Sequence, residues 1–236
     1  MFEMVKSLVP NLRPQCIHCD FEQAAIGAMT ECFPGVKIRG CFFHLAQSMH
    51  RHITAVGATS QYNNDPDFAL KAKMILALAF VPHHDLDIYT EALSDFLPEE
   101  LLPILDWFEY NYIGIYNRRS RRRRPRLFPH DMWSNYETTL NDSDRTNNHA
   151  EAAHRRIAFE LGANHPTIWK FIETLMKLQK GRDVYMEQLI SGCPPPLKLK
   201  KYRNADERIK KIVLEYNGER DALEYLRGIA HNYQMN

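Results

Sequence analysis

The sequence predicts an α/β fold in which helices occupy most of the chain. Residues 14–53 follow a strand, helix, strand, helix pattern, and apolar residues after position 53 recur at helical spacing. When a helix connects two neighbouring strands, the strands are expected to be parallel, because parallel strands need such a crossover segment between them. Open parallel sheets bind ligands just beyond the carboxyl ends of their strands. We therefore expect any chemistry at that edge of the sheet.

Each element of this first region has its own local signal. The first strand is expected at 15–20 and ends on the carboxylate of Asp20. Helical spacing predicts a helix over 21–32, which Pro34 and Gly35 terminate. Residues 36–40 alternate apolar and basic side chains, which is typical of a second strand. A second helix is expected to begin within 41–44 and to continue to residue 53.

The rest of the chain is predicted to be helical. Apolar stripes at three- and four-residue spacing indicate helices over 68–81, 88–96, 98–112, 145–161, 166–190 and, in two short pieces, 205–234. The apolar positions are Ile88, Ala92, Leu93 and Phe96 in one helix, and Ile168, Phe171, Ile172, Leu175, Met176 and Leu178 in another. In the helix over 98–112, the expected buried face is Leu101, Leu102, Leu105, Phe108 and Tyr112. The three prolines at 194–196 form a stiff break before the tail.

Composition indicates an ordinary globular protein. The chain has 236 residues, 44% of them hydrophobic, and a net charge of +1, so it can bury a core without a global charge bias. Its five cysteines show no disulfide framework, and its first residues lack the apolar region of a signal peptide. The longest apolar run, near 74–81, is too short to span a bilayer. These features predict a soluble, reduced, intracellular protein without a membrane segment.

Asp20 and Glu151 are the candidate pair of metal-binding carboxylates. Two-metal phosphoryl transfer needs carboxylates that hold two divalent ions roughly 4 Å apart, and such hard oxygen ligands suit Mg²⁺ or Mn²⁺. A strand-end aspartate and a glutamate on a facing helix can supply them. Helix capping is the alternative, with Asp20 as the N-cap of the following helix and Glu151 in a capping box with Asn148. The pattern alone leaves both interpretations open.

A second candidate is a Cys-x2-His motif formed by Cys41 and His44, which follows Cys16-x2-Cys19 in the sequence. Together these residues have the spacing of zinc ligands. However, residues three apart on a strand point to opposite faces, so Cys16 and Cys19 are not expected to bind one ion. A buried thiol and a histidine at a helix start are the simpler interpretation of Cys41 and His44.

A run of arginines follows the third of these helical segments, and it is a candidate for contacts with nucleic-acid phosphates. Arginine binds phosphate oxygens in bidentate fashion, and a run of arginines gives salt-dependent, sequence-independent affinity. A solvated loop and a nuclear-import signal are the alternatives. Within nine positions the chain carries Arg118, Arg119, Arg121, Arg122, Arg123, Arg124 and Arg126.

The order of several segments resembles the transposase domain of Mutator-like elements. No single segment is specific, but the ordered set is, and it covers about residues 15–180. The segments are CDFEQAA at 19–25, FPGVKIRGCFFH at 33–44, LALAFVP at 76–82, YIGIYNRRSRRRRPRLFPHDMWSNYE at 112–137, RTNNHAEAAH at 145–154 and HPTIWKFIETL at 165–175.

This resemblance implies an RNase H-like (DDE superfamily) fold that cuts and joins DNA through Mg²⁺ or Mn²⁺ bound by three acidic residues. Asp20 matches the second acid, Glu151 matches the third, and Cys41 and His44 match the family's Cys-x2-His motif. The family's first acid lies on an opening strand that the printed sequence does not show ahead of Asp20. Asn148, His154 and Arg155 are secondary candidates for organising the site or contacting DNA.

The sequence therefore predicts an N-terminally truncated RNase H-like core, α/β by ancestry and predominantly helical. Residues 1–192 would form the partial transposase domain with a helical insertion at about 58–142, and 193–236 a helical tail. The expected function is that of a transposase-derived, DNA-binding, nuclear protein whose catalytic centre is incomplete, so that binding of Mg²⁺ or Mn²⁺ is weak or absent. The alternative is a non-catalytic nucleic-acid-binding module that uses the loop from Arg118 to Arg126. The sequence leaves oligomerisation open.

Overall fold

The computed structural model describes the chain except for residues 115, 118–121, 124–125, 144, 147, 196, 219, 234 and 236, and except for the side chains of 116–117, 122–123 and 148–151. It contains two compact units. Unit 1 comprises Met1–Thr146 and Asn204–Asn236, and unit 2 comprises Asn147–Arg203. The domain limits predicted from the family resemblance lie elsewhere, and they remain a prediction.

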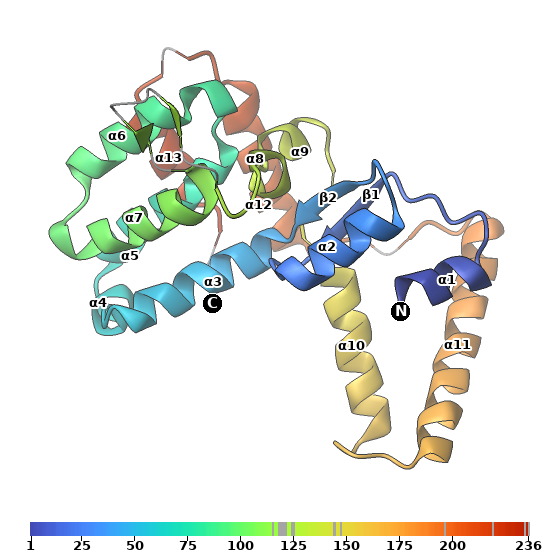
Figure 1. The fold of residues 1–236 in the computed structure, drawn as a ribbon. Coiled ribbons are helices and arrows are strands. Elements are labelled where there is room, and N and C mark those ends of the chain that lie inside the picture. Colours follow the sequence, from blue (N-terminus) through green and yellow to red (C-terminus); the bar gives the residue numbers. More distant parts are fainter. Residues whose placement is uncertain are drawn as a thin grey trace. The chain divides into compact units, whose positions relative to one another are not determined.

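The predicted parallel strand pair is present in unit 1 (Figure 1). Strand β1 (Cys16–Cys19) pairs in parallel with β2 (Lys37–Gly40), with Ile17 opposite Ile38 and Cys19 opposite Gly40. Helix α2 (Gln23–Cys32) makes the crossover, and α3 (Phe42–Ala55) follows β2 directly. The short helix α1 (Phe2–Leu8) contacts α2, where Lys6 Nζ donates to the carbonyl of Cys32 at 2.9 Å.

Helices make up most of unit 1, as the sequence predicts. Their bounds are α4 (Thr59–Asn64), α5 (Pro66–Ala77), α6 (Leu86–Phe96), α7 (Leu102–Phe108), α8 (His130–Trp133), α9 (Tyr136–Leu140), α12 (Lys200–Leu214, which begins in unit 2) and α13 (Ala222–Ala230). Short 3₁₀ turns at Leu78–Phe80, His83–Asp85 and Glu99–Leu101 and a π-helical turn at Glu109–Ile113 connect them. The two-residue strands β3 (Tyr116–Asn117) and β4 (Arg122–Arg123) pair antiparallel.

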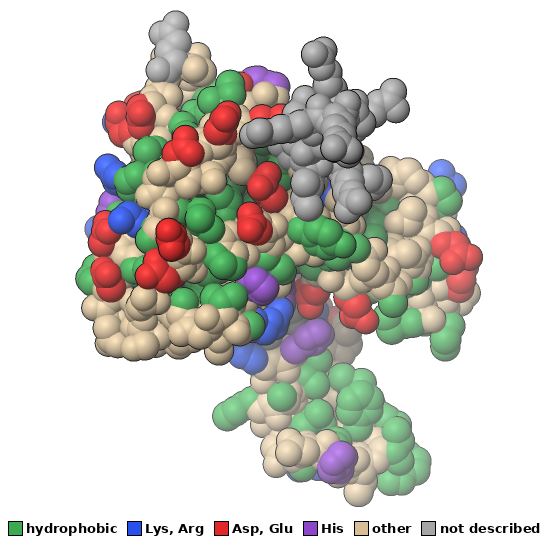
Figure 2. Space-filling view, turned by 60° about the vertical axis from the view of Figure 1, so that its left-hand side comes forward, with side chains coloured by type: hydrophobic (Ala, Val, Ile, Leu, Met, Phe, Trp, Pro, Cys, Tyr) green, Lys and Arg blue, Asp and Glu red, His purple; other side chains and the backbone are tan. Residues whose placement is uncertain are grey.

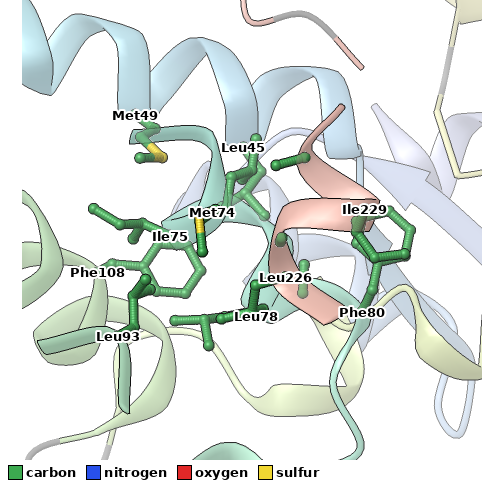
Figure 3. Close-up of a cluster of buried hydrophobic side chains, with 14 of the residues drawn as sticks. Leu45, Met49, Met74, Ile75, Leu78, Phe80, Leu93, Phe108, Leu226 and Ile229 are labelled. Atoms are coloured by element: carbon green, nitrogen blue, oxygen red, sulfur yellow. The ribbon is translucent and has the colours of Figure 1, made fainter. Parts of the chain in front are cut away.

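The core of unit 1 forms where α3, α5, α6, α7 and α13 meet (Figure 3). Residues 74–81 are fully buried, because the apolar run covers every face of α5 and of the turn that follows it. Leu226 and Ile229 of α13 pack into the same cluster, and the hydroxyl of Tyr225 donates to the Phe80 carbonyl at 2.6 Å. The tail beyond Asn204 is therefore part of the core that the central helices build.

The apolar stripe predicted for α6 differs from the face that the structure buries. Leu93 is fully buried, but Ile88 is 64% exposed, and Leu86, Tyr89 and Thr90 are buried in its place. The helix begins at Leu86, two residues earlier than predicted. Tyr89 packs edge-on against Tyr225 of α13, so contact with the tail rotates the buried face away from Ile88.

Unit 2 is a hairpin of two helices, α10 (Asn148–Leu161) and α11 (Ile168–Ile190). Thr167 caps α11 by accepting from the amide of Lys170, and Glu160 pairs with Lys177 at 2.8 Å. The buried residues of this hairpin that the structure describes are Leu161, Thr174 and Leu178. The other apolar positions predicted for this helix are open to solvent: Ile168, Phe171, Ile172, Leu175 and Met176 are 38–63% exposed.

Within the described part of the chain, no helix combines the length and the apolar character needed to cross a membrane.

Candidate functional site

Asp20 and His44 meet at the carboxyl ends of the parallel strands. Asp20 directly follows β1, and His44 lies in the first turn of α3, which directly follows β2. The Nδ1 atom of His44 is 2.9 Å from Oδ1 of Asp20, and the side chains are 21% and 54% exposed. We call Cys19, Asp20, Cys41 and His44 the strand-end site. A pair of residues predicted separately, 24 positions apart in the sequence, is thus brought into contact.

The local fold at the strand-end site excludes the capping interpretation of Asp20. Helix α2 begins after Glu22, which occupies the N-cap position. Asp20 is therefore not the N-cap of α2, and its carboxylate lies beside His44 instead. Cys41, which is fully buried, occupies the N-cap position of α3, and its amide donates to the Cys19 carbonyl at 2.9 Å. This bond extends the strand pairing by one step and holds the two strand ends together.

Gly40 and Phe21 fix the position of the strand-end site. A Cβ atom at Gly40 would lie 2.3 Å from Cζ of the Phe21 ring. That ring packs edge-on against Phe128 and Tyr112, at centroid distances of 5.0 and 5.6 Å, so it has little room to move. Because Gly40 has no side chain, the ring of Phe21, the residue after Asp20, can pack over the end of β2.

Replacement of Gly40 by alanine is expected to destabilise unit 1 and to displace the strand-end site. Overpacking of a filled site costs about 1–3 kcal/mol. Urea unfolding would measure the loss, and the double variant Gly40→Ala with Phe21→Leu should recover part of it because the smaller side chain clears the Cβ. The matched control is Gly27→Ala on α2, where a Cβ meets no atom within 4 Å. Equal unfolding midpoints for Gly40→Ala and Gly27→Ala would contradict this account.

The thiol of Cys19 is held in its protonated form. Burial raises the pKa of Cys19 to about 11, and the neighbouring carboxylate of Asp20 and the thiols of Cys16 and Cys41 act in the same direction. Because the thiolate is the form that binds metals and acts as a nucleophile, Cys19 is poorly suited to either task at neutral pH.

The residues of the strand-end site fit a divalent metal only in part. The exposed carboxylate of Asp20 offers the hard oxygen donors that Mg²⁺ and Mn²⁺ prefer. Among the described residues, however, no three histidine, cysteine, aspartate or glutamate side chains are grouped so that they could hold a metal ion. The side chain of Glu151, the other predicted carboxylate, lies outside the described residues.

The segment that leads to Glu151 begins beside the strand-end site. The amide of Phe42, the first residue of α3, donates to the carbonyl of Arg145 at 2.9 Å. The Arg145 side chain is 15% exposed, pairs with Asp206 of α12 and lies over the ring of Phe80. These contacts anchor the start of the RTNNHAE segment to α3 and to the core of unit 1.

The structure describes only some of the remaining predicted site residues. His154 and Arg155 lie on exposed positions of α10, while the side chain of Asn148 lies outside the described residues. In the arginine run, Arg126 is described and half-buried, and Arg122 and Arg123 are described only as backbone of β4. Outside the described residues altogether lie Arg118, Arg119, Arg121 and Arg124.

The sequence pattern gave no indication of a shallow surface depression among polar side chains in unit 1, which is too narrow to hold a water molecule. His18 and Arg39 are opposite each other in the β1–β2 register and line it together with Asn135 and Arg145. Arg39 donates to the hydroxyl of Thr138 on α9, which ties the sheet to that helix. The parallel register predicts that His18 and Arg39 are neighbours, but only the tertiary fold brings Thr138 and Arg145 to them.

No family model matches the chain, and the comparisons with curated proteins and with solved structures found no similar protein.

Proposed function

We propose that the chain is a transposase-derived DNA-binding protein with RNase H-like ancestry, in which Asp20 and Glu151 are two carboxylates of the ancestral centre for DNA cleavage and strand transfer. The observation that carries the proposal is the contact between Asp20 and His44 at the carboxyl ends of two parallel strands. It supports the proposal because the two residues belong to separate segments of the ordered motif set.

Two further observations support the same assignment. The side chain of Asp20 is more than half exposed, so a ligand can reach it, and Nδ1 of His44 on α3 lies 2.9 Å from its Oδ1 atom. Arg145, the first residue of the RTNNHAE segment, is bonded through its carbonyl to the first residue of α3. The segment that carries the third predicted acid therefore starts within unit 1, next to the strand-end site.

In this proposal the chain positions part of the ancestral catalytic centre and does not by itself catalyse cleavage. Asp20 would supply one metal-binding carboxylate, and a divalent cation bound there would polarise the phosphate and activate the attacking oxygen. His44 would hold the carboxylate in one orientation through its Nδ1 contact. Asp20 and Glu151 are two of the three acids that the resemblance implies for cleavage, so the chain alone is expected to bind DNA without cutting it.

The test is an assay of DNA binding and cleavage with the purified chain, double-stranded DNA and Mn²⁺. The variants are Asp20→Asn and Glu151→Gln, and the matched control is Asp106→Asn on an exposed surface of α7. Binding without cleavage is the expected result for the wild type. Cleavage that both site variants abolish and the control retains would support the carboxylate assignment and overturn the expected inactivity. Absence of DNA binding at low salt would overturn the proposal itself.

A non-catalytic nucleic-acid-binding module is the second candidate function, favoured by seven arginines within nine positions, from Arg118 to Arg126. If this loop alone carries binding, alanine at Arg121, Arg122, Arg123 and Arg124 should remove most of the affinity and flatten its dependence on salt. Affinity that is indifferent to both salt and these substitutions would eliminate this candidate.

A further inference from the structure

We infer that the α10–α11 hairpin, Asn147–Arg203, is a second surface for the nucleic-acid phosphate backbone. The inference rests on the proposed DNA-binding function and adds a site that the sequence motifs did not indicate. It is carried by the distribution of charge between the units, by the exposure and pairing of the basic side chains, and by aromatic groups among them.

Charge is strongly segregated along a chain whose net charge is only +1. Unit 2 holds ten of the 30 lysines and arginines but only five of the 29 aspartates and glutamates, which gives it a charge of +5. Unit 1 without the seven arginines of residues 118–126 holds 13 basic and 24 acidic residues, a charge of −11. Positive charge is thus concentrated in the hairpin and in the arginine run, as expected of polyanion-binding surfaces.

The basic residues of the hairpin are accessible. Lys170, Lys177 and Lys180 are seven and three residues apart, which places them on one face of α11. All three are exposed, and Lys177 pairs with Glu160 of α10. Lys170 and Lys180 have no carboxylate partner among the described residues. A face with two uncompensated ammonium groups on a 23-residue helix can follow a phosphate backbone.

A second group of charges follows the proline break, at the end of unit 2. Lys200, Lys201 and Arg203 are exposed at the start of α12, and Nζ of Lys201 lies 4.7 Å from the ring centroid of the exposed Tyr202. Exposed aromatic rings among basic residues are the composition of surfaces that hold nucleic-acid backbones and stack on bases. Trp169, 74% exposed in the first turn of α11, adds a further ring.

The surface of unit 1 has the opposite character. Exposed acidic side chains gather over α6, α7 and the turn between them: Asp87, Glu91, Asp95, Glu99, Glu100 and Asp106. In Figure 2 acidic side chains are prominent on unit 1. Because like charges repel the phosphates, DNA is expected to avoid this acidic surface and to engage the basic hairpin.

The experiment compares two triple variants of the full chain that lose the same charge. The hairpin variant is Lys170→Gln, Lys180→Gln and Lys201→Gln, and the control variant is Arg51→Gln, Arg208→Gln and Lys211→Gln in unit 1. Affinity for a 30-base-pair duplex would be measured by fluorescence anisotropy between about 50 and 200 mM salt, the range over which phosphate contacts change affinity. Thermal unfolding of each variant checks that it folds as the wild type does.

The hairpin variant is expected to bind at least about tenfold more weakly and to lose about 2–3 from the salt slope, since each phosphate contact contributes about 0.9. The control variant should keep the wild-type slope. A wild-type chain that binds DNA while both variants bind equally well would overturn the hairpin assignment and leave the proposed function standing. A wild-type chain that binds no DNA would overturn both.

Discussion

Removal of the residues after Cys193 is expected to leave unit 1 unable to fold cooperatively. The truncation deletes Ile209, Val213, Tyr225, Leu226, Ile229 and Met235, each at most 2% exposed. Burial of one such side chain contributes about 1.5–3 kcal/mol, so their combined loss of about 9–18 kcal/mol equals or exceeds the whole stability of a typical domain. Circular dichroism and size-exclusion chromatography should show an expanded chain without a sharp thermal transition.

Single substitutions in the tail measure how much individual side chains contribute to the stability of unit 1. Ile229→Ala removes a fully buried side chain of α13 and should cost about 2–5 kcal/mol. Leu214→Ala, at the 60% exposed end of α12, should cost no more than about 0.5 kcal/mol. A cooperative transition in the chain of residues 1–193, with the midpoint of the full chain, would show that the tail is an appendage after all.

Stability of unit 1 is expected to fall as the pH drops from 7 to 5, because of His130. Burial, with a smaller contribution from the neighbouring His83 and Arg126, lowers the pKa of His130 to about 4, while Asp131 opposes the shift. The imidazole is 9% exposed and packs against His83 and edge-on against Trp133. No described residue accepts from or donates to its Nε2 atom.

The direction follows from proton binding in the two states. The unfolded chain protonates this histidine near pH 6.5, whereas the folded chain does so only near pH 4, so the unfolded state binds more protons between these values and stability declines there as pH falls. At pH 5 the loss attributable to His130 should be about 2 kcal/mol relative to pH 7. The measurement is urea unfolding of the wild type, of His130→Phe and of the control His84→Asn at both pH values.

His130→Phe should abolish that part of the pH dependence, because phenylalanine fills the same site between His83 and Trp133 without a titrating group. His84→Asn should retain it, since the His84 side chain is 77% exposed. A wild-type pH dependence that persists in His130→Phe would assign the effect to other groups.

The first part of the fold is determined by short-range signals in the sequence. Alternation at 36–40, helical spacing at 21–32 and the break at Pro34–Gly35 predict β1, α2 and β2, and the crossover length dictates that the strands pair in parallel. The position of Asp20 at a strand end and of His44 just past the next strand follows from the same pattern. Their placement at one edge of the sheet therefore follows from local sequence, whereas their contact does not.

The tertiary structure decided what local patterns leave open. Ile88 fits the helical stripe of α6 as well as Leu86 does, and only the packing of α13 against α6 selects the buried face. Likewise, the proline break at 194–196 predicts a separate tail, but Tyr225 and Ile229 complete the core around α5. The spacing of hydrophobic residues indicates that a helix has a face to bury. Which element packs against that face depends on residues far away in the sequence, which a local pattern does not include.

The same distinction applies to function. The sequence by itself determined the candidate carboxylates, the arginine run and the segregation of charge, because these depend on residue type and order. Only the tertiary structure showed that Asp20 contacts His44 instead of capping α2, and that the apolar stripe of α11 is exposed. The physical reason is that a side chain's partner is chosen by three-dimensional packing among alternatives that are equally compatible with the local sequence.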